Sequence, residues 1–491
     1  MKGNQPLYRF LYDSLVSQIE KGVLRQGDSL PSQQALCGQY NVGITTVRYT
    51  LRLLEQNGYI VVSPRRRPVV LAGRQGQAGL PRLLAEKEMV LDVYQSLYFL
   101  MPALETSAAQ NFNDVSALKG AARAVAWHKS TPPARGRAIL FFYKLIDVYQ
   151  NQLLIDFLSD SEHFTHIPYE SFHRLNPSVV YTPQMLGEYL LSIADMIEIK
   201  NFSVVHHKFQ KLYDITFAWM KTYLHELEAQ YPGVKDVPSP PFTPKKRLCL
   251  YTSVACDLYR RLKKGEFSET RYLPSLAGLQ KEYHISAFSA RQALGLLNDV
   301  GVVYTHDKKG TAPAAPGMGP FPLRIDTKTV FENLILFLDT LQILALTTGF
   351  FVKEAVQALS DEEAGQLALR WQALEDRACA DSLFTALWDF LKEHLSGVYL
   401  KASFRQLEEC LLWGGYLSRL SQDGRRVSPA VSKRYLHTLC GALRQKDAPA
   451  FARAASSFFC LVYNAARDRV LSCGAKAGRL PLPLKEEYLC F

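Results

Sequence analysis

The sequence lacks long uncharged apolar runs, and it lacks the close cysteine pairs of zinc ribbons and disulfide-rich scaffolds. Its apolar stretch at residues 138–158 is interrupted by Lys144, Asp147 and Asp156, so we expect no membrane-spanning helix. The nine cysteines are odd in number, scattered, and form no Cys-x-x-Cys pair. We see no secretory signal in residues 1–10. Free thiols in a reducing cytoplasm are the expectation.

Sequence motifs of catalysis are missing as well. We see no phosphate-binding Gly-x-x-x-x-Gly-Lys loop, no Gly-x-Ser-x-Gly turn and no His-Glu-x-x-His helix. These absences exclude, as functions of this chain, the nucleotide hydrolases, serine hydrolases and zinc proteases that carry those motifs. We therefore expect neither an enzyme activity nor a cofactor.

Positive charge is present, and it is unevenly distributed. The 491 residues correspond to about three or four domains, and their formal net charge is +11. Residues 1–74 and 245–312 each carry an excess of six positive charges, which leaves the remainder close to neutral. Two basic islands in a neutral background indicate two separate surfaces for a polyanion.

The two islands are copies of one another. A shift of 243 residues superimposes them without a gap, so that Leu30-Pro31-Ser32 falls on Leu273-Pro274-Ser275 and Arg48 falls on Arg291. In the same register Tyr40 falls on Tyr283, and Gly22 and Gly58 fall on Gly265 and Gly301. This pattern indicates an internal duplication.

A weaker match extends the duplication beyond the islands. At a shift of 246, Thr182-Pro183 lies over Ser428-Pro429, and Leu212-Tyr213 lies over Phe458-Phe459. The predicted plan is island, helical segment, island, helical segment. The expected boundaries are residues 1–75 and 245–315 for the two island domains, 82–230 and 323–491 for the two helical domains, and 231–244 for a proline-rich linker.

Each island has the pattern of three helices followed by a hairpin. Leu7, Leu11, Leu15 and Ile19 recur at helical spacing before Gly22. Ser32 is a good N-cap for a second helix that reaches Gln39 or Tyr40. A third helix is predicted over 44–56, and short strands are predicted at 59–63 and 68–71 around a run of arginines. Two helices, a short turn and a basic hairpin are the parts of a winged helix-turn-helix.

The motif resembles the N-terminal domain of the GntR family of transcription regulators. The resemblance covers about 65 residues in each half, and its residues in the first copy are Leu30-Pro31-Ser32, Leu36, Val42, Thr45-Thr46-Val47-Arg48, Leu51, Leu54-Glu55 and Gly58-Tyr59-Ile60. It implies a mainly α fold, with two winged helix-turn-helix domains, each followed by an all-α bundle. It also implies double-stranded DNA as a partner.

Three family arginines that contact DNA fall on Gln34, Ile44 and Arg48 here, so only one is retained. A glutamine can still read the N6/N7 edge of adenine. Arg52 could equally face solvent, whereas the arginine run is expected to contact the DNA backbone or the minor groove, with a solvated loop as the alternative. The candidate DNA contacts of the first copy are Ser32, Gln34, Thr45, Thr46, Arg48, Arg52, Arg65, Arg66 and Arg67.

The second copy departs further from the family pattern. Ala277 and Ala287 replace Gln34 and Ile44, whereas Arg291 persists. We therefore expect the second copy to contribute affinity more than base discrimination. Its candidate contacts are Ser275, Ser286, Ser289, Arg291, Lys308 and Lys309.

The helical segments resemble the effector and dimerisation bundles of the FadR-like branch of the family. That branch often binds a metal through aspartate and histidine. Solvated histidines are the commoner reading, and we expect no metal; the candidates would be His163, His166 and His173, or His206 and His207. Clusters such as 141–143 could line an effector cavity, although core packing is the more frequent role at that spacing. The effector is unknown.

The expectation from sequence is a cytoplasmic regulator, a repressor, which binds operator DNA through two domains and responds to a small-molecule effector. The alternative is a largely non-specific or architectural DNA-binding protein, because several base-reading arginines are missing. One chain can act as a pseudo-dimer, since it carries both domains. A homodimer with four such domains is the other arrangement.

Overall fold

The computed structural model describes most of the chain between residues 11 and 486. The described residues are 11–71, 83–127, 131–165, 182–234, 250–314, 328–414 and 427–486, with short interruptions at 13–14, 17–18, 20–23, 25, 41–43, 64–66, 264, 268–271, 300, 307–308, 378, 412, 476–477 and 479. The linker predicted at 231–244 lies outside these residues from position 235 onward.

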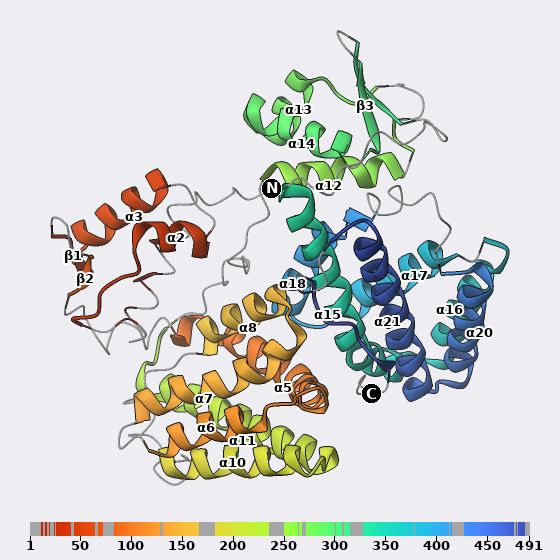
Figure 1. The fold of residues 1–491 in the computed structure, drawn as a ribbon. Helices are drawn as coiled ribbons and strands as arrows, with labels where there is room; N and C mark the ends of the chain where they lie inside the picture. The colour runs from red at the N-terminus through yellow and green to blue at the C-terminus, as the bar shows by residue number, and fades with distance from the viewer. Residues whose placement is uncertain are drawn as a thin grey trace. The chain divides into compact units, whose positions relative to one another are not determined.

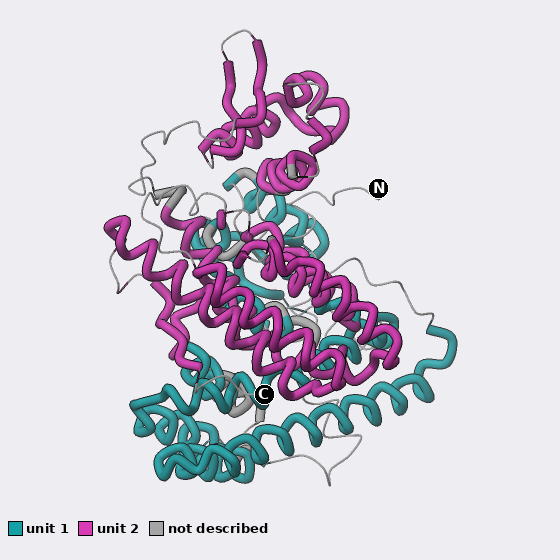
Figure 2. The backbone as a smooth tube through the Cα atoms, turned by 90° about the vertical axis from the view of Figure 1, so that its right-hand side faces the viewer, with its two compact units in different colours: residues 1–147, 155–246, 397–400 teal, residues 148–154, 247–396, 401–491 magenta. Residues whose placement is uncertain are grey.

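The chain forms two compact units (Figure 2). Unit 1 comprises residues 1–147, 155–246 and 397–400. Unit 2 comprises residues 148–154, 247–396 and 401–491. Each unit contains one basic island and one set of long helices, which confirms the predicted mainly α fold and its internal duplication.

The island of unit 1, called head 1, has a helix-turn-helix and a small hairpin (Figure 1). The described residues between 11 and 19 are helical. The later elements are α2 (Gln33–Tyr40), α3 (Ile44–Gln56), β1 (Ile60–Val61) and β2 (Val69–Val70). The predicted bounds of the third helix are confirmed. The strands are shorter than predicted, because the ladder pairs only Ile60 with Val70 and Val61 with Val69.

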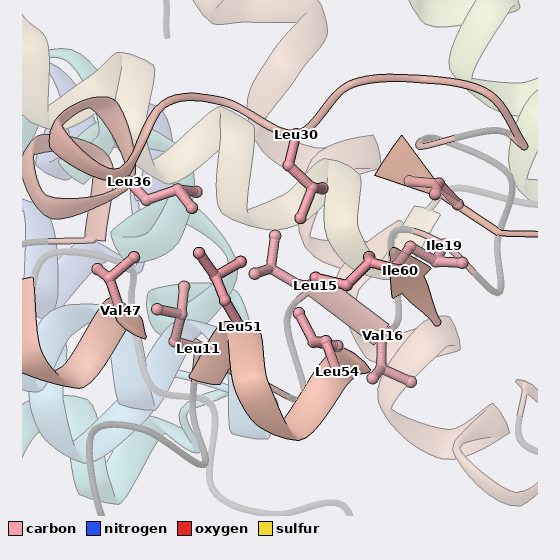
Figure 3. Packing of buried hydrophobic residues seen from close by; sticks show 11 residues of the cluster. Leu11, Leu15, Val16, Ile19, Leu30, Leu36, Val47, Leu51, Leu54 and Ile60 are labelled. Atoms are coloured by element: carbon pink, nitrogen blue, oxygen red, sulfur yellow. The ribbon is translucent and has the colours of Figure 1, made fainter. Parts of the chain in front are cut away.

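The core of head 1 brings the apolar face of each helix together (Figure 3). Burying a leucine or valine side chain stabilises a fold by about 1.5–3 kcal/mol relative to leaving it exposed. The residues that recur at helical spacing in the sequence are therefore the ones that form this cluster. Its buried members are Leu11, Leu15, Val16, Ile19, Leu30, Leu36, Val47, Leu51, Leu54, Ile60 and Val70.

The long helices of unit 1, called bundle 1, pack largely in pairs. Helix α5 runs along α11, and α6 packs against both α7 and α10. Tyr94, Met220 and Leu224 belong to the cluster that joins α5 to α11. The elements are α5 (Lys87–Gln110), α6 (Val115–Ala126), α7 (Thr131–Ile146), α8 (Gln152–Thr165), α10 (Pro183–Glu198) and α11 (Phe202–Gln230), with the 3-10 turn η1 (Asp147–Tyr149) after α7.

The island of unit 2, called head 2, repeats the arrangement of head 1 with longer strands. Its elements are α12 (Leu250–Lys263), α13 (Leu276–Tyr283), α14 (Ala287–Asp299), β3 (Val303–His306) and β4 (Gly310–Pro313). The hairpin ladder runs from Val303 opposite Pro313 to His306 opposite Gly310. Gly310 has φ +111°, a backbone conformation that residues with a side chain rarely adopt.

The long helices of unit 2, called bundle 2, are centred on α15, which packs along α21. By length and composition, residues 331–358 of α15 could cross a membrane, but 78% of the apolar window is buried inside the structure. A core helix of a bundle has this composition. The elements are α15 (Lys328–Ala358), α16 (Asp361–Gln372), α17 (Ala380–His394), α18 (Val398–Cys410), α20 (Pro429–Gln445) and α21 (Ala448–Ser472), with η2 (Glu375–Arg377) after α16.

The last two helices of each bundle show the duplication most clearly. The hydroxyls of Thr182 and Ser428 cap α10 and α20, and a proline follows each cap. The turn to the next helix places a lysine at positive φ in both copies, Lys200 at +57° and Lys446 at +50°. These matches follow the shift of 246 residues that the sequence indicated.

Unit 1 includes a short segment from the second half of the chain, which the sequence did not predict. Residues 397–400 belong to this unit. The backbone N–H of Tyr399 donates to a carboxylate oxygen of Asp92 at 2.7 Å, and its hydroxyl donates to the carbonyl of Phe157 at 3.2 Å. Gly397 has φ +82°, and a Cβ there would lie 2.2 Å from Asp92 Oδ1. Only glycine fits this position.

Unit 2 includes the equivalent segment of the first half, residues 148–154. The Asn151 side chain donates to the carbonyl of Asp339 at 2.9 Å and to the side-chain oxygen of Gln342 at 2.8 Å. The N–H of Leu153 donates to the Asp339 carboxylate at 3.4 Å. The same kind of contact, a carboxylate on the first long helix and a backbone N–H, therefore occurs in both units.

Candidate DNA-binding interface

Helix α3 of head 1 is amphipathic, and its exposed side carries the residues of interest. Val47, Leu51 and Leu54 are buried in the head 1 core. Arg48 and Arg52 are exposed on the other side. In a helix-turn-helix this helix lies in the major groove, so its exposed side is the one that faces bases. Arg48 and Arg52 therefore lie on the side of α3 that is not occupied by the head 1 core.

Arg48 has a partner on the preceding helix. Its Nε donates to Oε1 of Gln33 at 3.2 Å, and both side chains are exposed. Gln34, which is the predicted DNA contact on α2, is also exposed. Sequence reasoning missed Gln33, because the family pattern points to the next residue. The bond joins the first residue of α2 to the fifth residue of α3.

The serine at the start of α2 acts as predicted for a cap. The Ser32 hydroxyl accepts a hydrogen bond from the N–H of Ala35 at 3.1 Å. This bond satisfies one of the free backbone donors of the first helical turn. Thr46 is half-buried on α3, and the side chain of Thr45 lies outside the described residues.

The hairpin of head 1 is held against the rest of the head on one side. The N–H of Val70 donates to the carbonyl of Asp28 at 2.9 Å, and the N–H of Leu30 donates to the carbonyl of Pro68 at 2.8 Å. Arg67 is exposed beside β2. Arg65 and Arg66, the other predicted wing contacts, lie outside the described residues.

Head 2 uses its serines mainly for capping. Ser275 Oγ accepts from the N–H of Gly278, and Ser286 Oγ accepts from the N–H of Ser289, both at 3.1 Å. The hydroxyls of Ser286 and Ser289 are themselves 3.1 Å apart. Arg291 is exposed one turn into α14. The position of Gln33 is occupied by Leu276, so the amide partner of the first copy is lost.

Part of the positive charge of head 2 is neutralised locally. Arg261 donates to Glu266 at 2.8 Å and to Glu282 at 2.6 Å. It also donates to the hydroxyl of Tyr283, which in turn donates to Asp257 at 2.6 Å. Burial and the hydrogen bond to Asp257 raise the pKa of Tyr283 to about 12. Arg261 therefore braces α12 against α13.

The wing of head 2 carries one described lysine. Lys309 is exposed at the hairpin turn, whereas Lys308 lies outside the described residues. The ring of His306 meets Tyr304 edge-on, with centroids 4.7 Å apart. Thr305 and Thr311 share a cross-strand hydrogen bond of 3.0 Å.

Bundle 1 contains a fully buried carboxyl group. Glu105 Oε1 accepts a hydrogen bond from the Tyr213 hydroxyl at 2.7 Å, whereas Oε2 is buried without a partner. Burial raises the pKa of Glu105 well above its usual range, and the Tyr213 hydrogen bond opposes that shift. Burial therefore favours the protonated form of this carboxyl relative to that of an exposed glutamate.

The histidine candidates form no metal cluster among the described residues. His206 Nδ1 lies 3.3 Å from the Thr106 hydroxyl, and burial lowers the pKa of His206. His207 is exposed. His166, His173 and the side chain of His163 lie outside the described residues.

Known proteins resemble parts of this chain. The family described as "Bacterial regulatory proteins, gntR family" matches residues 7–70 and 250–312. The Escherichia coli (strain K12) mannosyl-D-glycerate transport/metabolism system repressor MngR is 46% identical over 55 residues, 11% of this chain and 23% of that protein. The Bacillus subtilis (strain 168) regulator TreR is 35% identical over 79 residues, 16% of this chain and 33% of that protein. The chain thus spans a quarter to a third of these relatives.

Solved structures of similar proteins align over nearly half of this chain. E. coli McbR/YncC is 17% identical with a TM-score of 0.24, covering 46% of this chain and 100% of that one. Streptococcus agalactiae GntR is 16% identical with a TM-score of 0.20, covering 44% and 99%. The family matches, by contrast, coincide with the two heads. Residues 7–70 and 250–312 are thus two domains of the gntR family of bacterial regulatory proteins, in tandem on one chain.

Proposed function

We propose that this chain is a DNA-binding transcription regulator, a repressor of the GntR type, which recognises operator DNA through both heads. The observation that carries the proposal is the pair of equivalent arginines, Arg48 and Arg291, on the exposed sides of α3 and α14. Each sits one turn into the helix that enters the major groove in this domain type. Exposed basic residues beside both hairpins, Arg67 and Lys309, are suited to phosphate contacts.

A competition titration tests this proposal. The full chain is titrated with DNA from upstream of its own gene against random duplex at one fixed salt concentration. A specific regulator prefers its site by roughly 10³–10⁷-fold. If the ratio of the two affinities is near one, the chain has only a general affinity for DNA, and the proposal of a specific regulator is wrong.

The wing has its own experiment. We expect the triple replacement of Arg65, Arg66 and Arg67 by alanine to reduce the slope of log affinity against log salt by about one per lost phosphate contact. Replacing Lys309 by alanine in head 2 is the matched single change. An unchanged slope in the triple variant would remove the wing from the interface.

A second candidate function is a largely non-specific or architectural DNA-binding protein. The replacement of base-reading arginines by Ile44 and Ala287 favours it. The same titration separates the two candidates, because an architectural protein keeps its affinity and its salt dependence on random duplex.

We further propose that a small-molecule effector modulates binding through a bundle. The pair formed by buried Glu105 and half-buried Tyr213 makes bundle 1 the better candidate, since Tyr213 corresponds to the buried Phe459 in bundle 2. A thermal-shift screen of metabolites on the full chain and on Glu105→Gln tests this. A compound that stabilises the two proteins equally would place the effector elsewhere.

The chain is proposed to act as a pseudo-dimer, because one polypeptide supplies both heads. Sedimentation of the protein with a single duplex site would give one chain per site in this arrangement. Two chains per site would instead support a homodimer with four heads. Cytoplasmic localisation is part of the same proposal.

A further inference from the structure

Head 2 exposes apolar side chains at the start of its two helix-turn-helix helices. Phe288, the second residue of α14, is 67% exposed. Leu276, the first residue of α13, is 37% exposed, and Ala277 beside it is also exposed. An aromatic ring left in water forgoes the stabilisation that burial would supply. Covering the Phe288 ring with a binding partner would supply that stabilisation.

The backbone that carries Phe288 is well defined. Ser286 caps α14 through the N–H of Ser289, which fixes the first turn of the helix. Ala290, Leu294 and Leu297 on the opposite side are buried in head 2. Phe288 thus projects from a capped helical turn whose other face is locked in a core. In a helix-turn-helix these first residues are the ones that face base edges.

Head 1 has a different chemistry at the same positions. The shift of 243 residues places Gln33 over Leu276 and Thr45 over Phe288. Head 1 therefore offers an amide and a hydroxyl where head 2 offers two apolar side chains. The two heads differ in the kind of base edge that they can contact, while Arg48 and Arg291 occupy the same position in the two copies.

The major groove has one apolar feature, the C5-methyl group of thymine, and phenylalanine is a residue suited to it. We propose that Phe288 reads a thymine methyl in the half-site bound by head 2, with Leu276 beside it. This inference rests on the proposed DNA-binding function. It also changes the expectation for head 2, which becomes a discriminating reader instead of a contributor of affinity alone.

Charge identifies DNA as the occupant of this surface. The second island has an excess of six positive charges. Arg291 is exposed one turn beyond Phe288, and Lys309 is exposed on the wing. Double-stranded DNA suits an apolar side chain with cations nearby. Its phosphates can contact Arg291 and Lys309 while a base methyl contacts the Phe288 ring.

The test removes the methyl from the DNA. The preferred duplex is first selected from a random library with the full chain. Each thymine of that duplex is then replaced by uracil, which pairs identically but lacks the methyl. We expect at least one replacement to weaken binding by the wild-type chain about fourfold, the affinity equivalent of burying one methyl group.

Three variants show whether Phe288 is responsible. Phe288→Ala should bind the thymine and uracil duplexes equally, since the contact is already absent. Phe288→Leu should restore part of the difference, because it keeps an apolar contact. Leu369→Ala is the matched control, since Leu369 is 64% exposed on α16 of bundle 2. It should behave as wild type.

The outcomes separate this inference from the proposed function. If the wild-type chain selects no preferred duplex, the proposed function as a specific regulator is wrong. If it selects one, but wild type and Phe288→Ala lose equal affinity on uracil substitution, the reading role of Phe288 is wrong and the regulator stands. A change in oligomeric state of Phe288→Ala without any methyl effect would identify a protein contact and would also overturn the inference.

Discussion

Head 1 and head 2 share a core and differ on their exposed helical sides. Leu54 and Leu297 occupy the same position in the two copies, and both are fully buried. In head 1 an amide from α2 holds Arg48, whereas Leu276 replaces that amide in head 2. Core packing tolerates little change after duplication, because a lost methyl group costs stability in either copy. Exposed positions carry no such penalty and are free to diverge.

The two bundles differ in where they bury polar groups. Bundle 1 buries Glu105 against Tyr213. Bundle 2 uses Gln342, whose amide nitrogen donates to the carbonyl of Leu482 at 3.0 Å. Tyr463 also donates to that carbonyl, at 2.6 Å. Gln342 and Tyr463 of bundle 2 therefore share the carbonyl of Leu482, while the Glu105 carboxyl of bundle 1 retains an oxygen without a partner.

The largest expected effects come from the shared core. Leu54→Ala and Leu297→Ala should each lower the unfolding free energy of their own head by about 2–5 kcal/mol. Hydrogen exchange measured by mass spectrometry would show faster exchange in the altered head alone. Faster exchange in both heads from a single variant would contradict the view of two separately packed cores.

The next effect concerns base discrimination. Arg48→Ala should cost about 1–3 kcal/mol on the preferred duplex and relax specificity. Arg291→Ala should weaken binding to preferred and random duplex more evenly, because a phosphate contact carries no direct sequence information. The ratio of the two affinities measures the difference. Equal losses of specificity would make the two arginines equivalent readers.

The buried carboxyl of bundle 1 predicts a pH effect. The folded-state pKa of Glu105 lies well above the ordinary value of 4.5, so its protonated form is the one that folding favours. The stability it supports is present below pH 4.5 and is lost as pH rises through the folded pKa. Glu105→Gln should therefore become more stable relative to wild type as pH increases.

Denaturant unfolding at several pH values would measure the effect of Glu105. Glu188→Gln on the exposed side of α10 is the control, and it should leave the pH dependence unchanged. An identical pH profile for wild type and Glu105→Gln would mean that Glu105 titrates normally.

The smallest expected effect tests Gln33. Gln33→Leu gives head 1 the residue of head 2 and removes the hydrogen bond to Arg48. The expected loss on the preferred duplex is roughly 0.5–1 kcal/mol, the usual net contribution of one hydrogen bond. The reciprocal Leu276→Gln should not weaken binding on random duplex. A Gln33→Leu protein with unchanged specificity would show that Arg48 needs no support from α2.

Much of each head was predictable from local pattern. The third helix of head 1 has its predicted bounds, 44–56, because its apolar period and the Asn57-Gly58 stop are local signals. The strands of the wing were predicted too long. A strand ends where its cross-strand partner ends, and the partner of Ile60 is Val70, ten residues away. The β propensity of the residues alone does not show where the partner strand ends.

Two parts of the candidate site were not predictable in the same way. The Gln33–Arg48 bond joins residues 15 apart, and it depends on the angle between α2 and α3. The exposure of Phe288 depends on which face of α14 meets the head 2 core. Helical periodicity places Phe288 opposite Leu294 and Leu297 only once that core is known.

By itself the sequence determined the duplication, the charge of the two heads and the family of their fold. Those properties are carried by residue identity and spacing, which no tertiary contact can alter. Only the tertiary structure decided that residues 397–400 complete unit 1 and residues 148–154 complete unit 2. Asp92 meets Tyr399 across 307 positions of the chain, and a hydrogen bond at that separation leaves no periodic signal in the sequence.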